Sequence, residues 1–361
     1  MAAMDLIDRI GLEHRLVQAG MGGGVAGGRL AGAVSAAGAL GTVGMMAPRA
    51  FAAALREARR LAPSRPVAAN LLVPFVRRVH VEACIDGAAA LVVFHGGSGE
   101  RWYGSLRRAG IPILATVGTA VQARRVLAAG ADGLVVQGLE AGGHLVGVEP
   151  LIDALYRVQE VAADAPILAA GGVADAADVQ LLLAAGAAAA VAGTRFLLTE
   201  ESRAHPQYKR RVLDADRTLR TLLFGLGWPM EHRVVPNAAT DRWCATAELA
   251  PGWIRAVGRL SAPLGRALPL SAMGGLASVQ RPHLPLFSPA LPLAGMPSES
   301  VDRCALYAGE TIHRIHDIIP AAEAVARMTT TASGRSSALG TASDGNSSAV
   351  PGSPSHAPDR C

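Results

Sequence analysis

Cysteine is scarce in this chain of 361 residues, which contains only Cys84, Cys244, Cys304 and Cys361. No two of them stand at C-x-x-C or metal-ligand spacing, so the sequence predicts neither a disulfide framework nor a thiolate zinc site. Widely separated cysteines are typical of a reducing compartment, and we therefore expect a cytoplasmic protein. Acidic residues at Asp5, Asp8 and Glu13 lead us to expect no signal peptide.

Aromatic residues are also rare, at 4%, whereas hydrophobic residues make up 50% of the chain. Any core must therefore be built mainly from Ala, Val and Leu. The formal net charge of +5 would suggest a nucleic-acid partner only if the basic residues gathered on one surface. They occur instead as separated pairs, such as Arg59-Arg60 and Arg107-Arg108, which suit the outer faces of successive helices. We expect no nucleic-acid partner.

One apolar run, residues 179–198, could be mistaken for a membrane span. Gly186, Gly193 and Arg195 interrupt it, so it divides into a helix end, a turn and a strand. We therefore expect no membrane association.

Short β-branched runs alternate with alanine-rich helical stretches through the first 199 residues. The expected strands are residues 15–19, 39–43, 67–72, 90–95, 111–116, 133–137, 167–170 and 189–192. The expected helices between them are residues 28–37, 48–61, 76–87, 99–109, 119–129, 150–162 and 175–185. Eight such β/α repeats predict an α/β fold, a parallel (β/α)₈ TIM barrel over residues 1–199. A doubly wound open sheet is the competing architecture.

The pattern changes after Thr199, and residues 200–328 are expected to form a C-terminal extension that packs on the barrel near its active face. Residues 200–224 look helical, and residues 306–328 look like a returning helix. Prolines are too frequent in residues 225–301 for regular barrel elements, so we expect an irregular excursion there. Residues 329–361 have few large apolar side chains and should be a disordered tail.

Two glycine-containing loops follow the seventh and eighth expected strands. Gly171-Gly172 ends one strand, and Ala192-Gly193-Thr194 ends the other. In barrels these two loops commonly bind phosphate through free backbone N–H groups. Each glycine alone is more often a simple turn, but the two positions together predict a phosphate site.

Other candidate residues could contact a flat heterocycle. Asn70 and Gln137 end two expected strands, and buried amides suit the edge of a ring such as an isoalloxazine, although they could equally satisfy local backbone groups. Gly20 and Met21 lie in a glycine-rich loop after the first strand, where backbone could pass close under a ring face. A flexible linker is the alternative for this loop.

His144 follows a strand and a glycine-punctuated loop in Val135–His144, which places it at the predicted active face. A histidine there could donate, accept or move a proton near neutral pH. His80, His205 and His232 lack such a context. His313 and His316 share a helical face with Glu310 and could mimic a metal site, but nothing supplies further ligands, so we predict no metal.

Together these segments resemble the nitronate monooxygenase family, formerly called 2-nitropropane dioxygenases, and the related FMN-containing enoyl-ACP reductases. The resemblance runs from about residue 10 to 328 and lies in residues 16–24, 69–71, 137–144, 170–173, 192–196 and 306–310. It implies an FMN-dependent TIM barrel in which Asn70, Gln137, Gly142, Gly172 and Gly193-Thr194 contact FMN and His144 is catalytic. One departure is Gly20, where relatives often have proline.

The resemblance implies oxidation of an alkyl nitronate with O₂ to a carbonyl compound and nitrite. The partners would then be a small-molecule substrate and O₂, and the chain is compatible with a homodimer. An FMN-dependent NAD(P)H oxidoreductase, reducing an enoyl thioester or a quinone, remains the first alternative. A flavin-free barrel acting on a sugar phosphate is another, but Lys209 lies beyond the barrel strands and offers no obvious Schiff base.

Overall fold

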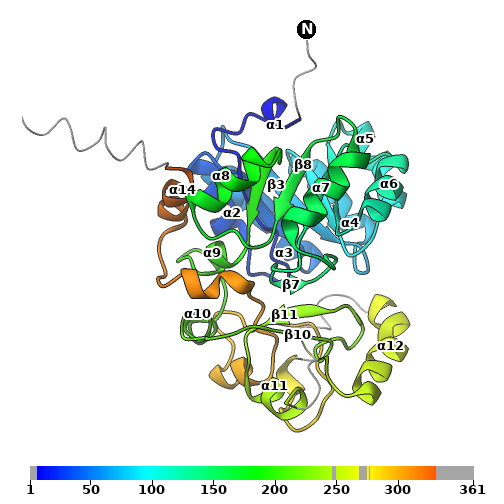
Figure 1. The fold of residues 1–361 in the computed structure, drawn as a ribbon, viewed down its shortest axis with the longest axis vertical. Helices are drawn as coiled ribbons and strands as arrows, with labels where there is room; N and C mark the ends of the chain where they lie inside the picture. Colours follow the sequence, from blue (N-terminus) through cyan, green and yellow to red (C-terminus); the bar gives the residue numbers. More distant parts are fainter. Residues whose placement is uncertain (1–5, 246–248, 268–274, 276, 331–361) are drawn as a thin grey trace, which may run out of the picture. The chain divides into compact units, whose positions relative to one another are not determined.

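The computed structural model describes residues 6–245, 249–267, 275 and 277–330. One compact unit contains the chain up to Thr329 (Figure 1). The tail predicted to be disordered, apart from Thr329 and Thr330, lies outside the described residues.

Eight parallel strands form the barrel in the order β1-β9-β8-β6-β5-β4-β3-β2. Their bounds are β1 Leu16–Gln18, β2 Gly41–Gly44, β3 Val67–Leu72, β4 Val92–His95, β5 Ile113–Val117, β6 Gly133–Gln137, β8 Ile167–Ala170 and β9 Ala189–Ala192. Val17 in β1 bridges to Leu40 just before β2, which brings the two ends of the sheet together. The predicted (β/α)₈ barrel is therefore confirmed, and the open sheet is excluded.

The Gln18 side chain completes this closure between β1 and β2. Its Oε1 accepts a hydrogen bond from the Thr42 backbone N–H at 3.0 Å, and its Nε2 donates to the Thr42 carbonyl at 3.2 Å. Gln18 is fully buried, so these bonds satisfy its amide where no water can reach it. The side chain thus adds to the backbone bonds between Gln18, Leu40 and Leu16 at the seam of the barrel.

Helices cover the outside of the barrel in the predicted order. They are α2 Gly28–Ala36, α3 Pro48–Leu61, α4 Arg78–Asp86, α5 Tyr103–Arg108, α6 Ala120–Ala128, α7 Leu151–Ala162 and α8 Ala176–Ala184. Local signals fix several helix starts. Pro48 occupies the first turn of α3, and the Asp175 carboxylate caps α8 by accepting from the Ala177 and Asp178 amides.

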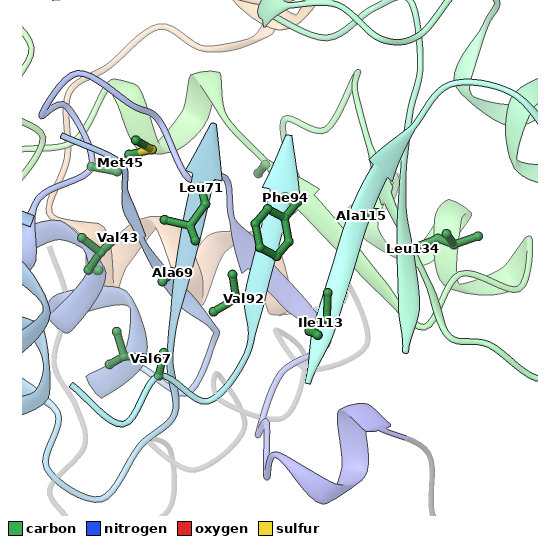
Figure 2. Packing of buried hydrophobic residues seen from close by; sticks show 14 of the residues in the cluster. Val43, Met45, Val67, Ala69, Leu71, Val92, Phe94, Ile113, Ala115 and Leu134 are labelled. Atoms are coloured by element: carbon green, nitrogen blue, oxygen red, sulfur yellow. The ribbon is translucent and has the colours of Figure 1, made fainter. Parts of the chain in front are cut away.

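Alternation along the barrel strands places their apolar side chains in two clusters. Outward-facing residues such as Val43, Leu71 and Phe94 pack between the strands and the helices (Figure 2). Inward-facing residues such as Leu91 and Leu168 fill the barrel and meet Leu6 and Ile7 of the short helix α1, Leu6–Arg9.

The extension contains more regular structure than the sequence indicated. After the short helix α9 Thr194–Leu197, which ends the barrel, its helices and strands are α10 Pro206–Leu213, β10 Leu219–Thr221, β11 His232–Val234, α11 Ala238–Trp243, α12 Gly252–Ala267 and α14 Ala321–Thr329, with 3₁₀ turns at Ser298–Asp302 and Glu310–Arg314. The helix expected over residues 306–328 begins only at Ala321. The region expected to be irregular carries β11, α11 and α12, because prolines stand at its turns and helix α12 accommodates Pro263.

The extension leaves and rejoins the barrel at one place. Thr199 forms a parallel bridge with Ile319, and the buried Arg195 guanidinium donates to the Asp317 carboxylate at 2.6 Å and to the Leu198 carbonyl at 2.7 Å. Helix α14 then packs on α2 and α8, as Figure 1 shows.

The apolar run over residues 179–198 is divided among α8, β9 and α9. Within the described part of the chain, no helix is both long and apolar enough to cross a membrane.

Candidate active site

A cavity of about 530 Å³ lies at the carboxyl ends of the barrel strands, where the strand alternation points Asn70, His95 and Gln137 inward. The predicted site residues that line it are Gly20, Met21, Asn70, Gln137, Gly142, His144, Gly171, Gly172, Gly193 and Thr194. Among the predicted site residues, Ala192 alone does not line the cavity. It is buried in β9, and its carbonyl accepts a hydrogen bond from the Ala19 amide at 2.9 Å.

The two loops predicted to bind phosphate meet at one side of this cavity. Gly171 and Gly172 have φ values of +125° and +70°, a backbone conformation that favours glycine. Among the described residues, no group accepts a hydrogen bond from the amides of Gly171, Gly172 or Gly193. The Thr194 hydroxyl accepts from the Gly309 amide at 2.9 Å, which leaves its own proton available to a ligand. These loops therefore offer unused donors to an anion.

Gly20 and Asn70 pack against each other at the first loop. Asn70 donates from Nδ2 to the Gly20 carbonyl at 3.1 Å. A Cβ on Gly20 would lie only 2.2 Å from the Asn70 Cβ, so no larger side chain fits here without a backbone shift. In this chain the loop at Gly20 therefore rests directly on Asn70.

Gln137 positions the loop that carries His144. Its Oε1 accepts from the Val146 amide at 2.7 Å, and its Nε2 donates to the His144 carbonyl at 3.2 Å. Although Gln137 lines the cavity, its contacts fit the alternative in which the amide satisfies local backbone groups. The Gln137 amide therefore holds this loop at the edge of the cavity that it lines.

His144 lies in a two-residue strand, β7 Gly143–His144, that the sequence did not predict. Its ring stacks on Trp228 with centroids 3.7 Å apart and planes at 14°. The ring Nε2 is buried and has no hydrogen-bond partner among the described residues. Burial, followed by the neighbouring His232 and His95, lowers the pKa of His144 well below its ordinary value, so the ring is neutral at neutral pH.

The alternative metal site at Glu310 has other contacts. The Glu310 carboxylate pairs with the Arg233 guanidinium at 2.8 Å, and Arg233 also donates to the Leu139 carbonyl at 2.8 Å. In the described ranges, no group of three His, Cys, Asp or Glu side chains is placed to hold a metal ion.

A family model described as nitronate monooxygenase matches residues 4–76 and 73–331, which is most of the chain. The chain belongs to the nitronate monooxygenase family. Membership confirms the resemblance in the sequence and makes this family member a flavin-dependent oxidoreductase.

Relatives of this family member carry two kinds of name. The chain is 35% identical over 243 residues to a (3aS,4S,5R,7aS)-5-hydroxy-7a-methyl-1-oxo-octahydro-1H-indene-4-carboxyl-CoA dehydrogenase of Mycobacterium tuberculosis, covering 66% of this chain and 67% of the relative. It is 36% identical over 161 residues to a nitronate monooxygenase of Pseudomonas aeruginosa, covering 42% and 46%. The chain therefore spans about two thirds of the first relative's length and less than half of the second's.

A solved structure supports the fold over nearly the whole chain. The structure of nitroalkane oxidase from Streptomyces ansochromogenes superposes with a TM-score of 0.70 at 27% identity, covering 93% of this chain and all (100%) of that one.

Four site residues of this nitronate monooxygenase family member escaped the sequence interpretation. His95 lines the cavity, and His232, Trp228 and Tyr307 surround the His144 ring. His95 ends strand β4 as Gln137 ends β6. The expectation that polar residues at the carboxyl ends of strands face the site could therefore have found it. No local signal marked His232, which we expected to lack a functional context, because only the pairing of β11 with β7 brings it to the site.

Acid should destabilise this family member through His232. Burial lowers the pKa of His232 to about 4, whereas the unfolded chain should protonate it near the ordinary value of 6.5. The stabilisation is therefore present above pH 6.5 and is lost as the pH falls towards 4, at a cost of about 3 kcal/mol. Urea unfolding across this range would measure it. His232→Phe should lose less stability over the same range, and equal losses would contradict the assignment.

Proposed function

We propose that this chain binds FMN in the cavity and oxidises alkyl nitronates with O₂ to a carbonyl compound and nitrite. The observation that supports this best is a neutral, buried His144 that lines the same cavity as loops with unused amide donors. Such a cavity suits a phosphate-bearing ring cofactor beside a proton acceptor.

The residues present fit FMN. Gly171, Gly172, Gly193 and Thr194 would hold its phosphate through free N–H groups and a hydroxyl. The loop at Gly20 would lie against the ring, and the cavity volume of about 530 Å³ is within the usual range for ligand pockets. The bound flavin would supply the electron chemistry.

His144 would act on the carbon acid. A neutral imidazole can take the proton from the carbon beside a nitro group, which converts a nitroalkane into its nitronate. The resulting imidazolium would then lie beside the nitronate anion and stabilise it. The low pKa of His144 disfavours the other role, in which a permanently protonated ring waits to hold an incoming anion.

We expect purified protein to be yellow and to release FMN, not FAD, on denaturation. The chain has phosphate-type loops but no G-x-G-x-x-G fingerprint of a dinucleotide site after a strand. Chromatography of the released flavin, together with nitrite release from a preformed nitronate under air, tests both parts of the proposal. FAD, or protein that is active without any flavin, would contradict it.

The dehydrogenase relative supports a second candidate, oxidation beside the carbonyl of a carboxyl-CoA thioester. The carbon next to a thioester carbonyl is also acidic, so the same neutral His144 could take its proton. Two measurements separate the candidates. Nitrite release from nitronates supports the first, and flavin bleaching by an acyl-CoA without O₂ supports the second. Rapid anaerobic bleaching by NADH or NADPH would instead identify an NAD(P)H oxidoreductase.

A further inference from the structure

His232 and His144 are directly opposite each other in an antiparallel pair of strands, β11 and β7. Opposite residues in such a pair place their side chains on the same face of the sheet. The ring centroids lie 5.3 Å apart with planes at 53°. Two imidazoles joined by an N–H···N bond of about 2.9–3.0 Å would have centroids roughly 5 Å apart. The two rings have about this spacing, but their Nε2 atoms form no hydrogen bond as the rings lie in the structure, so a bond between them needs a rotation of the rings.

The tautomer of His232 follows from its other contact. Its Nδ1 lies 3.0 Å from the Met230 carbonyl oxygen, which can only accept, so Nδ1 must carry the proton. Nε2 then has a free lone pair. That atom is buried and has no partner among the described residues. The rings of Phe224 and Tyr307 pack beside His232.

The His144 ring has a nitrogen that also lacks a hydrogen bond. Its Nε2 is buried without a partner in the described part of the chain. Three other side chains face its ring. The Tyr307 hydroxyl donates to the Pro289 carbonyl at 3.0 Å, Trp228 stacks on the ring face, and His95 bonds to the His144 backbone. Of the side chains around the His144 ring, His232 therefore has an unused acceptor, its Nε2 lone pair, for a proton on His144 Nε2.

We infer that His232 is a positioning residue: after a rotation of the two neighbouring rings it accepts a hydrogen bond from His144 Nε2–H and so fixes the His144 tautomer. One bond would satisfy both orphaned nitrogens. It would also leave the lone pair on His144 Nδ1, the nitrogen left to serve a substrate in the cavity that His144 lines. The inference rests on the proposed role of His144 as the base, and follows the general rule that a catalytic base is oriented by a third group.

Nitrogen NMR on the flavin-loaded full chain tests the tautomer without turnover. Long-range ¹H–¹⁵N correlations of ¹⁵N-histidine protein distinguish Nε2–H from Nδ1–H, and loss of signals in His144→Asn assigns that ring. We expect the Nε2–H tautomer in the wild type and in His232→Gln, whose side-chain oxygen can accept the same bond. His232→Phe should show a mixture of tautomers.

Kinetics give a second readout. His232→Phe should lower kcat on a neutral nitroalkane by about tenfold or more, within the 10²–10⁴ contribution of a general base, with little change on the preformed nitronate. His232→Gln should recover most of that loss. Phe224→Leu, which loosens packing around the same ring without removing the acceptor, should change both substrates equally.

An Nδ1–H tautomer of His144 in the wild type would overturn the inference, as would an unchanged tautomer in His232→Phe. If His232→Phe fails to fold, the wild-type tautomer and the His232→Gln result still decide. Full nitroalkane activity in His144→Asn would instead refute the proposed function, and the NMR result on the tautomer would stand independently of it.

Discussion

Replacing His144 by asparagine should slow turnover of neutral nitroalkanes by about 10²–10⁴-fold while FMN stays bound. The nitroalkane must lose a carbon-bound proton before it can be oxidised, and an asparagine amide cannot accept that proton. A nitronate arrives already deprotonated and needs only stabilisation of its charge, which the amide partly supplies. The loss on preformed nitronate should therefore be much smaller.

Steady-state kinetics on a nitroalkane and its preformed nitronate, with flavin content from absorbance, measure this separation. The residues that we assign to the phosphate are on other loops, so FMN content should match the wild type. Equal losses on both substrates would make His144 an electrostatic anchor instead of a base. Wild-type activity on both would refute its catalytic role.

Gly142→Ala should disrupt the site more severely than any change of a single cavity side chain other than His144. A Cβ at this position would lie 2.5 Å from the Ala308 carbonyl carbon and from the Gly309 nitrogen. The backbone of the facing segment therefore leaves no room for it. Overpacking of this kind costs about 1–3 kcal/mol and sometimes more. A displacement of about 1 Å in the loop that carries His144 would further cost on the order of 10²-fold in turnover.

The neighbouring Gly143 provides a matched control. Its φ is +80°, but no atom lies within 4 Å of where its Cβ would be. Gly143→Ala should therefore cost only the strain of a left-handed residue, about 1–2 kcal/mol, and should leave the segment at Ala308 in place. Thermal unfolding and turnover compare the two variants. A Gly142→Ala protein that matches Gly143→Ala in both would show that the close approach is unimportant.

The barrel could be predicted from sequence because its signals are local. Short β-branched runs mark the strands, and Pro48 and Asp175 mark helix starts within a few residues of where they act. The cavity could be predicted for the same reason, since parallel strands end at one face and bring Asn70 and Gln137 together there. The predicted strands overlap the observed barrel strands throughout.

The partners of the His144 ring could not be predicted, because they depend on contacts between distant segments. His232 and Trp228 reach it only when β11 pairs with β7, and a strand of two residues leaves no periodic pattern. The loop contacts of Gln137 could not be predicted either, because a buried amide at a strand end looks the same in sequence whether it contacts a ligand or its own loop. Cytoplasmic location and oligomeric state stay predictions.

The bridge between Thr199 and Ile319 holds the two ends of the extension side by side, so the segment between them resembles an insertion into the barrel chain. Because the ends are already held together, adding or removing residues between them changes the loop-closure entropy only slowly, by about 0.6 kcal/mol for each doubling of length. Exposed loops of this segment can therefore change in length at little thermodynamic cost, provided that the side chains it packs against the barrel are kept. Since His232 and Trp228 reach the cavity from the same segment, such changes would alter what the cavity accepts while leaving the strands beneath it intact.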